Sequence, residues 1–116
     1  MKLVQFSTGN SYLDPAVERY VMHGLGPGGF LSAVIAGDEE RAHNSADVHN
    51  KPLVEYITYQ LINHLPEAAS GSYVAMENWM RDVDNVRSAY VAEVTSQRAL
   101  DLFAGQSGDR YLERLA

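Results

Sequence analysis

Gly24-Leu-Gly-Pro-Gly-Gly29 is the stretch that decides the fold, and the apolar run Phe30-Leu-Ser-Ala-Val-Ile35 follows it directly. Gly24, Gly26 and Gly29 satisfy the G-x-G-x-x-G spacing that holds a pyrophosphate in dinucleotide-binding folds. That motif needs a preceding strand, because the turn must bring a helix N-terminus onto the pyrophosphate. Residues 14–23 instead read as a capped helix. The glycines are therefore predicted to end one helix and begin the next.

The signals before and after this corner are also helical. Asp14 followed by Pro15 is typical of an N-cap with proline at the first helical position. Gly24 can adopt the left-handed conformation that ends a helix, and Leu25 is expected to fold back on it as an apolar contact. Gly37-Asp38 then interrupts the apolar helix and begins a polar one, which is predicted to run to about residue 47.

The second half of the chain reads as three more helices and a last turn. Asn50-Lys51-Pro52 is expected to cap a helix that Leu65-Pro66 stops, and Gly71-Ser72 to open the next. Asp82 or Asp84 is predicted to cap a longer helix that ends near Gly105. The apolar and aromatic residues of these helices share a helical spacing: Leu53, Ile57 and Leu61, then Tyr73, Met76, Trp79 and Met80, then Val83, Val86, Tyr90 and Val94. Tyr111, Leu112 and Leu115 are predicted to form a short final turn.

The predicted class is all-α, a single domain over residues 1–116 built from five or six short helices. Only residues 2–6 have the pattern of a strand, and a lone strand has no partner with which to form a sheet. A chain of 116 residues with 46% hydrophobic and 21% charged residues is typical of one globular domain.

The composition excludes several classes of function. The chain has no cysteine, which rules out disulfides, thiol nucleophiles and Cys-ligated zinc or iron–sulfur clusters. Its net charge is −6, and its only lysines are Lys2 and Lys51, so direct binding to a phosphate backbone is not expected. No apolar run reaches the ~20 residues that span a bilayer, and no signal peptide is visible. A cytoplasmic protein is therefore predicted, with a basic protein surface as the better partner.

One cluster has the residue types of a metal site. Glu39, His43 and Asp47 are spaced four apart, so one helical face carries carboxylate, imidazole and carboxylate, with His49 close by in sequence. Such ligands suit zinc or manganese, although a second helix would have to complete the set. A solvated charged face is the favoured reading. No metal and no cofactor are predicted, and because no nucleophile elbow or phosphate-binding loop is present, no catalytic residue is assigned.

The aromatic residues indicate binding. The chain has seven tyrosines and one tryptophan, which are the residue types that anchor protein interfaces. Tyr56 and Tyr59 cannot both point into one core from the same helix, and Tyr12, Tyr73 and Tyr111 lie near the ends of elements. Several of these rings are therefore expected to be exposed.

The corner residues also carry a resemblance. The segment from Arg19-Tyr20 through Gly24–Gly29 to Phe30-Leu31 resembles a small uncharacterised family of tailed phages and prophages, whose members read arginine-tyrosine-isoleucine, glycine-isoleucine-proline-proline-glycine and serine-phenylalanine-leucine. The likeness covers residues 16–80, which would be the family-like core, and leaves 81–116 as a C-terminal helical extension. Gly26, Gly29 and Gly37 depart from the family's proline, serine and asparagine. The resemblance implies a phage setting and the host cytoplasm, and transfers no activity.

These observations together predict a small acidic protein that inhibits a host protein by binding it, most plausibly a defence complex such as a CRISPR effector. Its carboxylates would pair with basic side chains that normally hold phosphate. The residues expected at this interface are Asp38, Glu39, Glu40, Asp82, Asp84, Tyr56, Tyr59 and Tyr73.

Two alternatives stay open at this point. In the first, Gly26, Gly28 and Gly29 at the corner expose backbone N–H groups at a helix start and hold an anion, so that the protein sequesters a nucleotide second messenger. In the second, the protein is a homo-oligomeric structural or regulatory phage protein, with the helix from Asp84 to Gly105 as the seam of a homodimer. Nothing in the sequence names the target.

Overall fold

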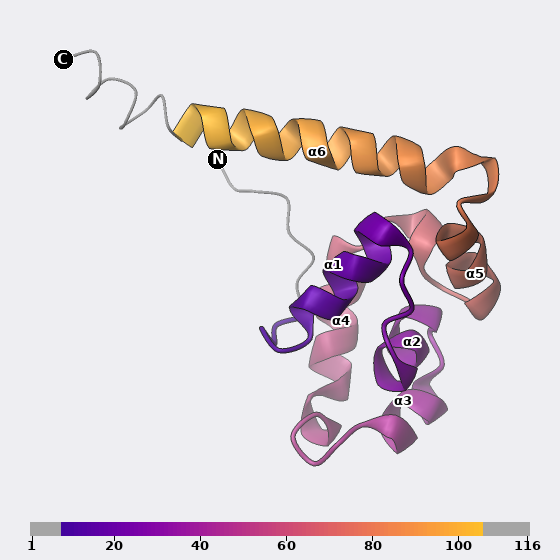
Figure 1. The fold of residues 1–116 in the computed structure, drawn as a ribbon. Helices are drawn as coiled ribbons and strands as arrows, with labels where there is room; N and C mark the ends of the chain where they lie inside the picture. Colours follow the sequence, from indigo (N-terminus) through magenta and orange to yellow (C-terminus); the bar gives the residue numbers. More distant parts are fainter. Residues whose placement is uncertain (1–7, 106–116) are drawn as a thin grey trace.

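Six α-helices and three short 3-10 helices make up residues 8–105, the part of the chain that the computed structural model describes (Figure 1). No strand occurs in this part, and the predicted all-α class is confirmed. The candidate strand at residues 2–6 and the turn with Tyr111, Leu112 and Leu115 lie outside the described residues. The helices are α1 (Asp14–His23), α2 (Gly29–Ala36), α3 (Glu39–Ser45), α4 (Val54–His64), α5 (Tyr73–Arg81) and α6 (Val86–Gly105), with η1 (Lys51–Leu53), η2 (Glu67–Ala69) and η3 (Val83–Asn85) between them.

The glycine corner joins α1 to α2, as predicted. Gly24 has φ 68°, and its N–H donates to the Tyr20 carbonyl at 2.9 Å, which ends α1. A Cβ on Gly24 would lie 2.9 Å from both the Met80 carbonyl oxygen and the Arg87 guanidinium carbon, so any side chain at this position would clash with both groups. Gly28 begins α2 with φ 93° and ψ 171°, a conformation that is essentially restricted to glycine.

The apolar helix α2 lies at the centre of the fold, in contact with α3, α4 and α5. Five of its eight residues are buried, which matches a short helix that is apolar on nearly every side. The helices around it contribute narrower apolar stripes. The buried apolar residues are Val17, Tyr20, Val21, Leu31, Ala33, Val34, Ile35, Ala36, Ala42, Ala46, Val54, Ile57, Leu61, Ala69, Met76, Trp79 and Val94.

Two buried hydrogen bonds fasten α1 to the second half of the chain. The Tyr20 hydroxyl donates to the Ala69 carbonyl at 2.6 Å, and the Trp79 indole N–H donates to the Val21 carbonyl at 3.1 Å. Both aromatic side chains thus bury a large apolar area and satisfy a main-chain acceptor at the same time. They belong to the core, so the only tryptophan is not available as an interface anchor.

The junction between α5 and α6 turns through three non-glycine residues in the left-handed region, Asp82, Asp84 and Asn85. Asp82 caps α6, as predicted, because its carboxylate accepts hydrogen bonds from the Ser88 N–H at 3.1 Å and from the Ser88 hydroxyl. Aspartate and asparagine tolerate this conformation better than other residues with a side chain, which is why the chain can turn here without glycine.

Beyond this junction α6 extends away from the rest of the fold (Figure 1). The Arg98 guanidinium holds it to α1 through both carboxylate oxygens of Glu18, at 2.5 and 2.9 Å. Val94 is buried, and the Tyr90 ring packs edge-on against Trp79 with centroids 5.7 Å apart.

Four local expectations are wrong, and in the first two a different hydrogen-bond partner replaces the expected cap. The Asp14 carboxylate does not cap α1 but accepts hydrogen bonds from the N–H and hydroxyl of buried Thr8 at 2.8 and 2.7 Å. Asn50 makes no side-chain cap, because it is buried and its amide oxygen faces Asn10. Leu25 is exposed rather than folded back. Leu53, Val83 and Val86, which the helical spacing groups with buried residues, are exposed as well.

Candidate functional site

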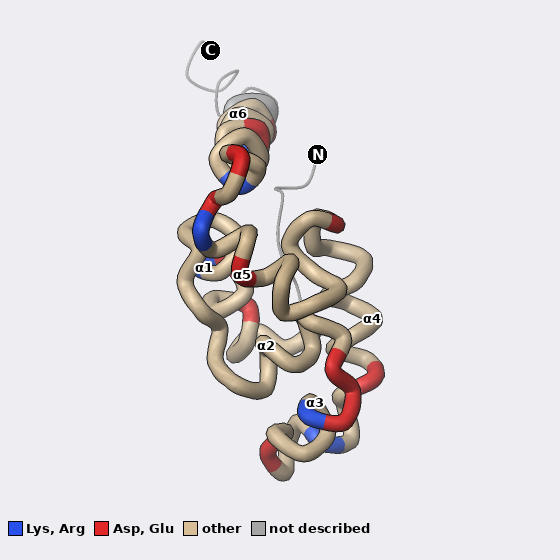
Figure 2. Tube along the Cα trace, turned by 90° about the vertical axis from the view of Figure 1, so that its right-hand side faces the viewer, with Lys and Arg blue, Asp and Glu red and all other residues tan. Residues whose placement is uncertain are grey.

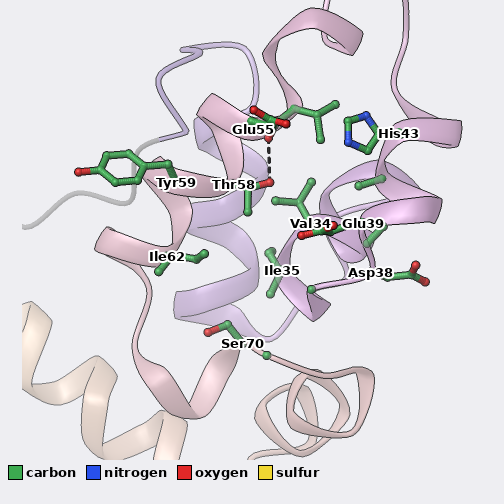
Figure 3. A pocket seen from close by; sticks show the side chains of 15 residues that line it. Val34, Ile35, Asp38, Glu39, His43, Glu55, Thr58, Tyr59, Ile62 and Ser70 are labelled. Carbon is green, nitrogen blue, oxygen red and sulfur yellow. Dashed lines mark hydrogen bonds between the residues drawn. The ribbon is translucent and has the colours of Figure 1, made fainter.

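A pocket of about 430 Å³ opens between α2, α3 and α4 (Figure 3). Its walls are apolar and come from buried residues: Val34 and Ile35 of α2, Ala42 of α3 and Val54 of α4. Ala33 of α2 and Ala42 of α3 also line the pocket, and their small side chains leave space that larger residues would fill. Ser70 and Gly71, in the loop before α5, close the remaining side. The volume falls in the ~300–1,000 Å³ range of ligand-binding clefts.

The mouth of this pocket carries negative charge. Glu39 and His43 reach it from α3, and Glu55 and Thr58 from α4, so that the two glutamates stand on opposite walls (Figure 3). The Thr58 hydroxyl already donates to the Val54 carbonyl at 2.8 Å. The residues that line the pocket include three acids, Asp38, Glu39 and Glu55, and neither lysine nor arginine. The pocket therefore presents acceptors to a ligand whose own groups donate.

Asp38 combines a place at the pocket edge with a role in the fold. One of its carboxylate oxygens accepts the Arg41 N–H at 3.2 Å as the cap of α3, and the other accepts the Tyr73 hydroxyl at 2.8 Å. The hydrogen bond from Tyr73 is the larger cause, and that from the Arg41 N–H the smaller, of a pKa of Asp38 that lies below its usual value. In Figure 3 its side chain points away from the other pocket residues.

Arg41 belongs to the same network and not to the pocket. Its guanidinium donates to the Tyr73 hydroxyl at 2.9 Å and lies 5.5 Å from the centroid of that ring. Arg41, the cation nearest in sequence to the acids of α3, is thus held by Tyr73 of α5. It does not line the pocket, so it does not neutralise Glu39 or Glu55 there.

The five acids predicted at an interface do not gather on one surface. Asp38, Glu39 and Glu40 lie at the start of α3, near one end of the molecule, whereas Asp82 and Asp84 lie at the α5–α6 junction toward the other (Figures 1 and 2). Asp82 is used as the cap of α6, and the Ser88 hydroxyl lowers the pKa of its carboxyl group. Of the five acids, only Asp38 and Glu39 line the pocket.

The predicted exposure of the tyrosines is confirmed for Tyr12, Tyr56, Tyr59 and Tyr73. Of these, Tyr59 lines the edge of the pocket with 65% of its surface exposed, and its ring points outward (Figure 3). Tyr56 faces a different neighbour, because a Cβ on Gly9 would lie 2.3 Å from its ring. Tyr73 serves the network around Asp38.

Sequence reasoning missed Glu55, Thr58 and Ile62, which form one outward row of α4 together with Tyr59. Ile62 is 69% exposed, a large value for an isoleucine next to a core helix. The spacing of these residues, three or four apart, is a signal that the sequence does contain. It was obscured by the stronger inward row of the same helix.

The glycine corner stands apart from this pocket, since none of Gly26, Gly28 and Gly29 lines it. A Cβ on Gly26 or Gly28 would meet nothing within 4 Å, and one on Gly29 would lie 3.6 Å from an Arg41 guanidinium nitrogen. The backbone conformation of the corner is explained by its role in ending α1 and beginning α2. Anion binding there stays a prediction.

The suggested metal ligands do not come together in the described part of the chain. Glu39 and His43 share the pocket, but Asp47 does not line it. Within residues 8–105, no three histidine, aspartate or glutamate side chains are close enough to one another to hold a metal ion.

Across the same residues, no helix has the length and apolarity required to cross a membrane.

Comparison of the chain with protein-family models, with curated proteins and with solved structures finds no match. The resemblance of residues 16–80 to a phage family therefore stays a prediction.

Proposed function

We propose that this protein acts by binding a basic surface on a partner protein, through the face that surrounds the α2–α3–α4 pocket. We call this the pocket face and define it by Asp38, Glu39, Glu55, Tyr59 and Ile62. One observation carries the proposal: an apolar pocket whose lining holds three acids and neither lysine nor arginine lies beside an exposed tyrosine and an exposed isoleucine.

The physical logic is that of an interface with anchors and a charged rim. Tyr59 and Ile62 supply apolar area that a partner can cover, and tyrosine loses little conformational entropy when it is fixed. Glu39 and Glu55 supply charge complementarity to lysine and arginine side chains. The net charge of −6 adds long-range attraction toward a basic partner and repulsion from nucleic acid itself.

The partner class follows from this charge. Protein surfaces that bind nucleic acid are rich in arginine and lysine, and an acidic protein that covers such a surface excludes the nucleic acid. With the phage resemblance of residues 16–80, the proposal becomes an inhibitor of a host nucleic-acid-binding protein, such as a CRISPR effector complex. The resemblance supports the phage setting, and the pocket face supports the mode of binding.

Affinity capture from a bacterial host lysate, with matched variants, tests the proposal. The pocket-face variant Glu39→Lys/Tyr59→Ala should lose the captured protein, because it reverses one charge and removes one anchor. The control Glu93→Lys/Tyr12→Ala changes the same residue types at exposed positions on α6 and before α1, so it should retain the protein. Added duplex DNA should compete with the wild-type chain for the captured protein.

Capture that survives in the pocket-face variant would contradict the proposal, as would capture that DNA leaves unchanged. If the wild-type chain retains nothing, binding to a host protein is itself refuted.

A further inference from the structure

We propose that the pocket is built to receive an arginine side chain of the partner, with the guanidinium group held between Glu39 and Glu55. This inference rests on the proposed function, because it names the group that the pocket face recognises. It concerns the interior of the pocket, whereas the proposed function concerns the surface around it.

The walls match the stem of a long cationic side chain. Val34, Ile35 and Val54 are buried apolar residues that meet at the pocket, and Ala33 and Ala42 widen it. The three methylene groups of an arginine gain free energy when such walls remove them from water. A carboxylate-bearing or phosphate-bearing ligand would meet the same walls but would face like charges at the mouth.

The mouth matches the charged head. Glu39 from α3 and Glu55 from α4 stand on opposite walls, and within residues 8–105 neither carboxylate accepts a hydrogen bond or joins an ion pair (Figure 3). Asp38 differs, since both of its oxygens already accept hydrogen bonds. The two glutamates thus keep their acceptor capacity, and Arg41, held by Tyr73, does not compete for it.

Arginine suits this arrangement better than lysine. A guanidinium group is planar and has five N–H donors, so it can donate to two carboxylates on opposite sides at once. It is also more weakly hydrated than an ammonium group, which lowers the cost of entering a pocket with apolar walls.

A titration followed by ¹H–¹⁵N NMR tests this with three small probes, namely the Nα-acetyl, N-methylamide derivatives of arginine, lysine and norleucine. The arginine probe should bind in the millimolar range and shift the amide signals of residues that line the pocket, with those of Gly26 and Ser88 as unaffected references. The lysine and norleucine probes should bind at least about threefold and tenfold more weakly, because the first lacks the planar fork and the second lacks the charge.

The variant Glu39→Gln/Glu55→Gln should weaken arginine binding at least about tenfold, because it removes both carboxylates and keeps their shape. The control Glu40→Gln/Glu93→Gln removes the same charge outside the pocket and should bind the arginine probe as the wild-type chain does.

Equal affinity in the two variants, equal affinity for the arginine and lysine probes, or shifts that avoid the pocket would each overturn the inference. Its failure is separable from that of the proposed function. A partner lost from Glu39→Lys/Tyr59→Ala with no arginine site would refute only the pocket's occupant, whereas an arginine site with no captured partner would refute only the host-protein function.

Discussion

The contacts of α1 with η2 and α5, which we call the closed region, and the pocket face use aromatic side chains for opposite purposes. At the first, Tyr20 and Trp79 are buried and each donates a hydrogen bond to a main-chain carbonyl. At the second, Tyr59 is exposed and the carboxylates of Glu39 and Glu55 keep their acceptors open. Residue type alone therefore does not mark an interface. A side chain whose contacts are complete holds the fold, and one whose contacts are incomplete is available to a partner.

The largest expected loss of stability comes from a substitution in the closed region. Trp79→Ala should lower the free energy of unfolding by about 3–5 kcal/mol, because it leaves a cavity and removes the bond to the Val21 carbonyl. Tyr59→Ala, the matched aromatic truncation at the pocket face, should stay within about 0.5 kcal/mol of the wild-type chain. Urea unfolding followed by circular dichroism measures both. Similar losses in the two variants would show that the regions do not differ as described.

The second effect concerns the corner that brings α1 against α5. Gly24→Ala should cost more than the ~1–2 kcal/mol of left-handed strain, because its Cβ would also lie 2.9 Å from the Met80 carbonyl oxygen. Gly26→Ala is the control, since a Cβ there meets nothing within 4 Å and φ is not positive, and it should be neutral within about 0.5 kcal/mol. Thermal unfolding of the pair tests this. Equal melting temperatures would mean that the corner is not under the constraint described.

A smaller effect isolates one hydrogen bond of the closed region. Tyr20→Phe keeps the ring and leaves the buried Ala69 carbonyl without its donor, which should cost about 1–3 kcal/mol. Tyr56→Phe, at an exposed ring, should cost little. Urea unfolding at pH 7 compares the two.

Tyr20 also gives this region a pH dependence. Burial raises the pKa of the Tyr20 phenol well above its ordinary value of 10.0. Because the folded-state pKa is the higher one, the stability it represents is complete below pH 10 and declines as pH rises beyond that value. Tyr20→Phe should therefore flatten the loss of stability above pH 10. An equally steep decline in the variant would contradict this role for Tyr20.

The smallest effect lies at the edge of the pocket face. Tyr73→Phe removes the hydroxyl that donates to Asp38, so the pKa of Asp38 should rise toward its ordinary value of 3.8. The folded-state pKa is depressed, so the stability linked to Asp38 is complete above that value and is lost as pH falls below it. The variant should lose less stability than the wild-type chain in acid.

NMR titration of the Asp38 carboxyl carbon measures this shift. Tyr59→Phe is the control and should leave the titration unchanged. An unaltered Asp38 pKa in Tyr73→Phe would show that the network of Asp38, Arg41 and Tyr73 does not operate in solution.

The helix ends were predictable because their signals are local. Gly24 and Gly37 end α1 and α2 in the left-handed conformation, and Ser72 caps α5 through its hydroxyl, each from contacts within a few residues. Asp82 at the start of α6 follows the same rule. The Asn50 cap failed because a distant residue, Asn10, donates to its amide oxygen. The Asp14 cap failed because Thr8, which precedes the helix, takes the carboxylate that capping rules assign to the helix N-terminus.

The candidate site was predictable only in part. Glu39 and Tyr59 were expected at an interface, and the structure places both on the lining of one pocket. Glu55 and Ile62 were missed, and Asp82 and Asp84 were grouped with acids that lie toward the other end of the molecule. Sequence spacing shows which residues share a helix face, but it contains no information on which faces of different helices meet.

Local sequence signals are enough to predict the helical class and the places where most helices begin and end, and composition gives the acidic, cysteine-free character that limits the partners. Backbone dihedral preferences and capping act between residues close in sequence, and composition does not depend on any contact. Helix packing, in contrast, places Trp79 in the core, brings Tyr73 to Asp38, and sets Glu39 and Glu55 of different helices on the lining of one apolar pocket. These outcomes depend on how whole helices pack, because burial of apolar surface is non-directional and the final arrangement selects which polar groups remain free.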